Sequence, residues 1–321
     1  MSNALPRPGV VPVFAQWTWQ PVAVVAVIAL GWWYARAARE HVRRGHDWPR
    51  RRAVTFGLGL VLAVWTSCGF LQVYVRSLYW VWTTQVLTLW LLVPAILLAG
   101  QPLQLAVAVH GPDTWLARAL HTRPARILSN PLVGPALVPI LSGVLFFGPV
   151  PQWGAFTPAF GWILQPVLVI LGAVLLLPLL GIDERPGTLA VALSLAIGSF
   201  ELVLDAIPGI VLRLHRGLVS GYFDHRVLHP WSRTHLQDQQ TAGSVLWVIA
   251  ELIDLPFLLL VFRQWLRADA RDAAAMDAVL DAEHAARAGM ADESQPEGTG
   301  DADAPWWLSD PEWQRRMRGQ P

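Results

Sequence analysis

Long apolar stretches, each bounded by polar or charged residues, recur along this chain of 321 residues. A helix needs about 20 apolar residues to cross the roughly 30 Å hydrocarbon core of a bilayer, and these stretches are close to that length. They predict seven membrane-spanning helices, at residues 20–35, 53–71, 79–100, 131–150, 161–181 and 189–212 and within 237–267. The predicted fold class is therefore all-α: a polytopic membrane protein built as a seven-transmembrane-helix bundle.

The same pattern divides the chain into three regions. We expect an extracytoplasmic N-terminus at residues 1–19, the seven-helix transmembrane domain at 20–262 and a cytoplasmic tail at 263–321. The tail continues as a charged helix, an acidic linker and an end rich in tryptophan and arginine, and we expect it to be partly disordered. Charged residues make up 15% of the chain, against about 25% in soluble domains, which agrees with a membrane location.

The placement of arginine predicts the orientation. Seven arginines lie in the loop 36–52 after the first span, whereas one precedes that span. Loops rich in basic residues stay in the cytoplasm, so we expect the N-terminus outside and the C-terminus inside. Four arginines in the predicted outer loop 213–237 disagree with this rule. The predicted inner loop 101–130 and the tail, however, contain further arginines on the inner side.

Polar residues in the last apolar stretch fall on one side of a helix at about 100° per residue. This stripe consists of Gln240, Gly243, Trp247, Glu251 and Asp254. A carboxylate at mid-membrane costs roughly 3 kcal/mol unless it faces protein or water, so we expect the stripe to face into the bundle.

The preceding span carries two carboxylates one turn apart, which can face this stripe. The functional polar seam that we predict consists of Asp238, Gln239, Gln240, Trp247, Glu251, Asp254, Glu201 and Asp205. Two interpretations stay open: a hydrogen-bonded contact that fixes the register of two helices, or a path for a cation or proton.

Side chains that bind copper are scarce in the predicted spans. Copper(I) prefers thiolate, thioether or imidazole ligands, and the spans contain one such group, Cys68. A lone buried cysteine is more typical of an apolar filler. The predicted outer loop holds other candidate metal ligands, His225, His229 and His235, which could bind Cu(II) or zinc. Four arginines in the same loop would repel a cation.

Motifs of catalysis are missing from the sequence. It contains no phosphate-binding P-loop, no HExxH metalloprotease motif and no GxSxG nucleophile elbow. We therefore predict no enzymatic activity, and we expect no nucleic-acid partner.

The last apolar stretch contains the pattern DQQ-x-x-G-x-x-x-W, from Asp238 to Trp247. Other segments agree: LLAGQPLQLA at the end of the third span, SNPLV opening the fourth, LPLLGID closing the fifth and APWWLSDPEWQRR near the end of the chain. In these segments, which extend over residues 53–318, the chain resembles the CtaG-type cytochrome c oxidase assembly factors. The resemblance implies a bacterial inner-membrane protein whose partners are heme-copper oxidase subunits and the lipid bilayer.

The resemblance also implies copper, because this family is implicated in supplying copper to the oxidase. Family members usually carry one pair of histidines at the outer end of the third span and another at the start of the fifth. The corresponding residues here are Trp82 and Val86 for the first pair, and Gly161 and Gln165 for the second. We therefore predict a divergent assembly factor that supports copper-centre maturation as a scaffold or partner. The alternative is a small transporter that passes a cation or proton through the acidic seam of helices six and seven.

Overall fold

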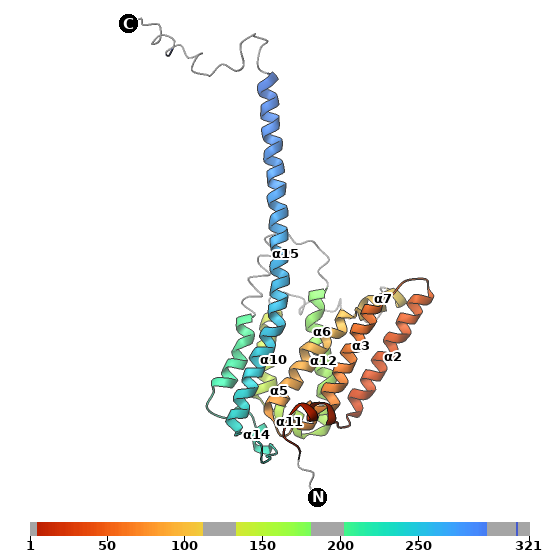
Figure 1. The fold of residues 1–321 in the computed structure, drawn as a ribbon, viewed down its shortest axis with the longest axis vertical. Helices are drawn as coiled ribbons and strands as arrows, with labels where there is room; N and C mark the ends of the chain where they lie inside the picture. The colour runs from red at the N-terminus through yellow and green to blue at the C-terminus, as the bar shows by residue number, and fades with distance from the viewer. Residues whose placement is uncertain (1–4, 112–132, 181–201, 294–312, 314–321) are drawn as a thin grey trace. The chain divides into compact units, whose positions relative to one another are not determined.

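The structure is a computed structural model that describes residues 5–111, 133–180, 202–293 and 313. Its contacts divide the chain into two units, Met1–Trp265 and Leu266–Pro321. Throughout the described residues, every regular element is a helix, and those of the first unit form a bundle (Figure 1). In the second unit, the described residues up to 293 continue the last helix.

The helices are α1 (Val10–Ala15), α2 (Pro21–Arg43), α3 (Arg50–Cys68), α4 (Phe70–Tyr74), α5 (Tyr79–Leu87), η1 (Thr88–Leu92), α6 (Val93–Ala99), α7 (Pro102–His110), α10 (Val133–Phe147), α11 (Val150–Phe156), α12 (Pro158–Leu180), α14 (Tyr222–His225) and α15 (His235–Glu293). A further helix covers residues 202–214.

Four helical stretches in the described residues are long and apolar enough to cross a membrane. They are Pro21–Arg43, Arg50–Tyr74, Tyr79–Ala99 and Pro158–Leu176. A fifth candidate is the pair Leu137–Phe147 and Val150–Phe156, which is bent by 58°. The fold is thus all-helical with four or five candidate spans, as expected for a polytopic membrane protein. Residues 189–201 of the predicted sixth span lie outside the described residues.

The bent pair extends beyond the fourth span that the sequence predicts at 131–150. Pro149 and Pro151 lack the N–H groups that would continue the hydrogen bonds of α10, so the chain turns and begins the short helix α11. In Figure 1, α1, α11 and α14 lie at one end of the bundle, and the loop 44–49 between α2 and α3 lies at the other.

The third candidate span contains a wide turn in its middle. Its turn η1 is a π-helix, and Pro94 is the second residue of the next helix, α6. Pro94 has no N–H, so it cannot donate a hydrogen bond to the carbonyl of Trp90 four residues earlier. That carbonyl lies against Gly172 of α12, where an added Cβ would be 1.6 Å from the oxygen. The contact fixes α12 directly against the backbone of η1.

Glycines and aromatic rings hold the other helices together. A Cβ added to Gly59 of α3 would lie 2.8 Å from Cδ2 of Leu97 in α6. Tyr34 of α2 stacks on Phe56 of α3 with ring centroids 3.9 Å apart, and its hydroxyl donates to the Gly100 carbonyl at 2.9 Å. These contacts place α2, α3 and α6 side by side.

We predict that Gly172→Ala destabilises the protein by about 1–3 kcal/mol or more, because the new methyl group would overlap the Trp90 carbonyl. The control is Gly57→Ala, since a Cβ at Gly57 meets no atom within 4 Å and alanine favours a helix by about 1 kcal/mol. Unfolding midpoints in detergent compare the two variants. Equal midpoints would show that α12 does not pack on the π-helical turn.

Candidate functional site

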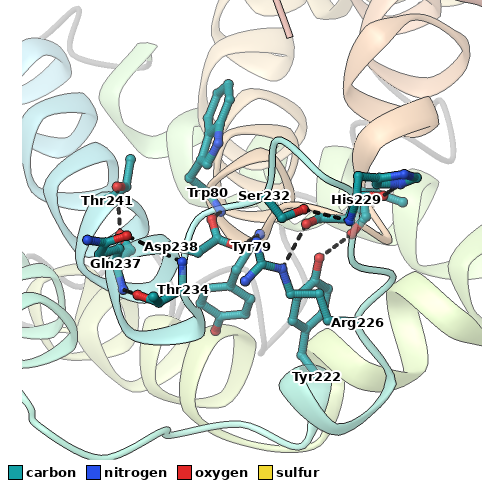
Figure 2. A network of polar contacts seen from close by, with 12 residues as sticks. Tyr79, Trp80, Tyr222, Arg226, His229, Ser232, Thr234, Gln237, Asp238 and Thr241 are labelled. Atoms are coloured by element: carbon teal, nitrogen blue, oxygen red, sulfur yellow. Dashed lines mark hydrogen bonds and ion pairs between the residues drawn. The ribbon is translucent and has the colours of Figure 1, made fainter. Parts of the chain in front are cut away.

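A buried ion pair joins the loop before α15 to the first turn of α15, beside the start of α5 (Figure 2). The side chains of Arg226 and Asp238 are 0% and 1% exposed, and Nη2 lies 3.3 Å from Oδ2. Asp238 also caps α5, since its carboxylate accepts the backbone N–H groups of Tyr79 at 2.8 Å and of Trp80 at 3.3 Å. Arg226 Nε donates to the carbonyl of Ser77 at 2.8 Å. These two side chains therefore connect the loop, the turn before α5 and the first turn of α15.

Further hydrogen bonds hold the same loop in place. Gln239 is fully buried; its Oε1 accepts the Val219 N–H at 3.0 Å and its Nε2 donates to the Gly217 carbonyl at 2.9 Å. The hydroxyl of Tyr222 donates to the Val75 carbonyl at 2.8 Å. Burial raises the pKa of Tyr222 well above its ordinary value, so this hydroxyl keeps its proton at physiological pH. The loop is thus fixed by uncharged donors as well as by the ion pair.

The predicted polar seam is divided in the structure. Asp238 and Gln239 point to the loop and to the start of α5, whereas Gln240, Trp247 and Glu251 follow another side of α15. Trp247 is 39% exposed, and its Nε1 donates to Glu251 Oε1 at 3.1 Å. The second group therefore borders the bundle surface.

Helix 202–214 crosses α15 at two glycines. A Cβ added to Gly209 would lie 2.8 Å from the backbone nitrogen of Trp247, and one added to Gly243 would lie 2.5 Å from that of Arg213. The paired positions run in opposite directions, so the two helices are antiparallel. Their backbones touch because neither glycine carries a side chain.

The same register places Asp205 level with Glu251. Asp205 is 9% exposed and Glu251 is partly buried. Glu201 lies outside the described residues, and so does the side chain of Asp254. Besides Asp238, the acidic residues of the seam whose side chains the structure describes are therefore Asp205 and Glu251.

The three candidate metal-binding histidines contact different aromatic rings. Their partners, with centroid distances, are Phe156 for His225 (5.7 Å), Trp231 for His229 (4.8 Å) and Phe223 for His235 (5.6 Å). In the part of the chain that the structure describes, no three His, Cys, Asp or Glu side chains form a group that could hold a metal ion. Metal binding by this loop stays a prediction.

A small cavity lies between α5, α11 and α12. Its volume is about 10 Å³, which is close to the minimum for one water molecule. The lining residues are Trp82, Gln85, Val86, Leu89, Gly154, Gly161, Leu164, Gln165 and Leu168. All four positions that the sequence resemblance aligns with paired histidines are among them. Residues far apart in the sequence therefore meet at one place.

The indole ring of Trp82 and three glutamine side-chain amides pack at this cavity. The ring of Trp82 lies so close to Gly154 that an added Cβ would be 2.2 Å from Cη2. Gln72 of α4 accepts hydrogen bonds from Gln85 and Gln165, both at 2.7 Å. These amides cross-link α4, α5 and α12 without any charge.

Comparison with known proteins assigns the family. A sequence profile described as "Cytochrome c oxidase caa3 assembly factor" matches residues 32–268. This chain belongs to that family. As expected for such assembly factors, it is a membrane protein of helices.

Proteins similar to this chain occur in mycobacteria. Uncharacterized proteins of Mycobacterium bovis and Mycobacterium tuberculosis are each 25% identical to it over 301 residues, and one of Mycobacterium leprae is 26% identical over 304 residues. Each alignment covers 89% of this chain and 45% of the relative, so the chain spans about half the length of the curated relatives that it matches. No solved structure matches the chain.

The cavity does not suit copper, the metal that the family resemblance implies. Its lining offers an indole, two amides and aliphatic groups. Copper(I) prefers thiolate, thioether or imidazole, and amide oxygens suit harder cations. In this chain, these positions therefore fit helix packing and hydrogen bonding.

No sequence pattern predicts the ion pair of Arg226 or the hydrogen bonds among the three amides. In the sequence, Arg226 is one of four arginines in the loop 213–237. Its spacing from Asp238 fits no helical or strand pattern that would connect the two residues. Gln85 lies between Trp82 and Val86, the two positions of the third span that the resemblance aligns with histidines, and this place in the sequence is a signal for the site. Gln72 lies outside every motif.

We predict that Arg226→Met and Asp238→Asn each destabilise the protein by roughly 3–5 kcal/mol, because each leaves one buried charge without its partner. The double variant should recover part of this loss, since an asparagine at 238 still caps α5. Unfolding in detergent and trypsin cleavage after the exposed Arg216 measure the effect. Glu40→Gln is the control, because it removes surface ion pairs with Arg43 and Arg44, each of which contributes at most about 1 kcal/mol. Additive losses in the double variant would contradict this coupling.

Proposed function

We propose that this chain supports the assembly of a heme-copper cytochrome c oxidase in a bacterial cell membrane. The observation that carries the proposal is the family match over residues 32–268. Its partners are oxidase subunits and the lipid bilayer. The chain acts in maturation of the copper centre as a scaffold or partner.

The residues that line the cavity between α5, α11 and α12 support the scaffold role. Trp82, Val86, Gly161 and Gln165 surround one cavity and bring no soft metal ligand to it. Copper, in this proposal, passes between partners of the chain and is not held by these four positions. The ion pair at the start of α5 keeps the adjacent loop in one conformation, as a docking surface requires.

We predict that the purified protein binds no copper tightly within the membrane. Metal analysis after loading with Cu(I), in competition with a chelator, checks this. The matched control lacks Cys68 and the loop histidines His215, His225, His229 and His235. Stoichiometric copper that survives those replacements would show that another site in the membrane binds copper.

We propose seven spans, with the N-terminus outside and the tail from residue 263 in the cytoplasm. The arginines of the loop 36–52 support this orientation. The loop 44–49 lies at the opposite end of the bundle from α1 and α11, so the two ends can be tested separately (Figure 1).

Cysteines replacing His46 and Thr157 test the orientation. Both native side chains are exposed. Gly45 and Gly154 are less suitable sites, because the first has a φ of 85° and the second contacts an indole ring. A membrane-impermeant maleimide should label position 157 in intact cells, and position 46 only after the membrane is opened; buried Cys68 gives the background. The reverse order of labelling would overturn the topology.

A second candidate function is passage of a cation or proton. It is favoured by Asp205, which is 9% exposed and level with Glu251 across the helix crossing. Ion flux in liposomes that contain only this protein would favour transport. Copper-free protein that purifies with oxidase subunits favours the scaffold.

We predict that the double variant Glu251→Gln, Asp254→Asn accumulates normally but lowers the oxidase level by about tenfold, since hydrogen bonds to charged groups contribute roughly 1.5–3 kcal/mol. The amides keep the shape and hydrogen-bonding capacity while removing the charge. Oxidase activity and copper content of membranes measure the effect, with Glu40→Gln as the control. Unchanged oxidase activity and copper content would show that the seam serves only as a packing contact between helices.

A further inference from the structure

One side of α15 presents a tryptophan, a carboxylate and two aliphatic side chains. Trp247, Val248 and Leu252 are 39%, 61% and 69% exposed, and Glu251 is partly buried between them. The four positions are spaced i, i+1, i+4 and i+5, so they lie on the same side of the helix. We call Trp247, Val248, Glu251 and Leu252 the α15 face.

The α15 face is held in position by the neighbouring helix. The contact between Gly209 and the Trp247 backbone prevents α15 from rotating, because a Cβ at 209 would lie 2.8 Å from that nitrogen. On the same edge, the guanidinium of Arg213 donates to the hydroxyl of Ser244. The direction of Glu251 is therefore set by backbone packing.

The carboxylate of Glu251 has hydrogen-bonding capacity beyond its contact with Trp247. It accepts the indole N–H at 3.1 Å, and an ionised carboxylate offers about four acceptor positions. Lipid tails offer no donor, so such a group facing lipid is strongly unfavourable. A protein surface that supplies a donor or a positive charge would remove this penalty.

We propose that the α15 face binds a membrane-spanning helix of a cytochrome c oxidase subunit that presents a basic or hydrogen-bond-donating side chain to Glu251. This rests on the proposed function, and it names the docking surface. Charge complementarity selects the partner. A symmetric contact with a second copy of the chain would instead bring the two Glu251 carboxylates toward each other. The aliphatic side chains at 248 and 252 supply the packing surface on either side of the charge.

Site-specific photo-crosslinking tests the proposal in cells that contain the full chain and the oxidase. A photo-reactive amino acid replaces Val248 or Leu252, and antibodies against each oxidase subunit identify the adducts. The matched controls replace Ile28 of α2 and Ile170 of α12, which are 65% and 63% exposed. We expect an adduct with an oxidase subunit from positions 248 and 252 and none from the controls. Glu251→Gln should lower its yield by about tenfold while the chain itself accumulates normally.

Three outcomes would overturn the α15 face as the docking surface: an adduct with a second copy of the chain, equal yields from the controls, or no protein adduct at all. Co-purification of oxidase subunits with the unmodified chain is measured in parallel. If subunits co-purify but no adduct forms at 248 or 252, the docking surface is wrong and the proposed function stands. If subunits do not co-purify, the proposed function fails, and the docking surface fails with it.

Discussion

The contacts of Asp238 are the constraint on which the rest of the bundle depends. Its carboxylate satisfies backbone N–H groups at the start of α5 and neutralises the buried guanidinium of Arg226. A buried charge without a partner costs several kcal/mol. The positions of the three segments that meet here therefore depend on one another. The start of α5 in turn sets the positions of Trp82 and Gln85 at the cavity and of the π-helical turn that follows.

Close backbone contacts transmit this placement through the bundle. Gly172 brings α12 against the backbone carbonyl of Trp90. Gly209 and Gly243 bring helix 202–214 against α15. In a membrane, helices gain little from hydrophobic burial against each other, so dispersion and backbone proximity carry more of the association. Such contacts leave little freedom for rotation or sliding, and they fix where Glu251 points.

The cavity between α5, α11 and α12 is closed by packing and hydrogen bonds between uncharged side chains. An indole against Gly154 takes up space, and amides at 72, 85 and 165 connect three helices. The position of the indole ring depends on Gly154, because a side chain at 154 would collide with the ring of Trp82. A membrane protein of the assembly-factor family can then act through its surfaces, namely the fixed loop and the α15 face.

The sequence by itself determined the helical class, the membrane location and the family. These follow from apolar length, charge depletion and the ordered motif from Asp238 to Trp247, all of which are local in the chain. It also identified the polar stripe, since helical periodicity needs no tertiary contact. Only the tertiary structure decided that Asp238 and Gln239 hold a loop while Glu251 borders the surface, and that Arg226 is the partner of Asp238. Those contacts join residues from different helices, and which side of a helix meets a neighbour depends on close backbone contacts such as Gly209 with Gly243, which no local pattern encodes.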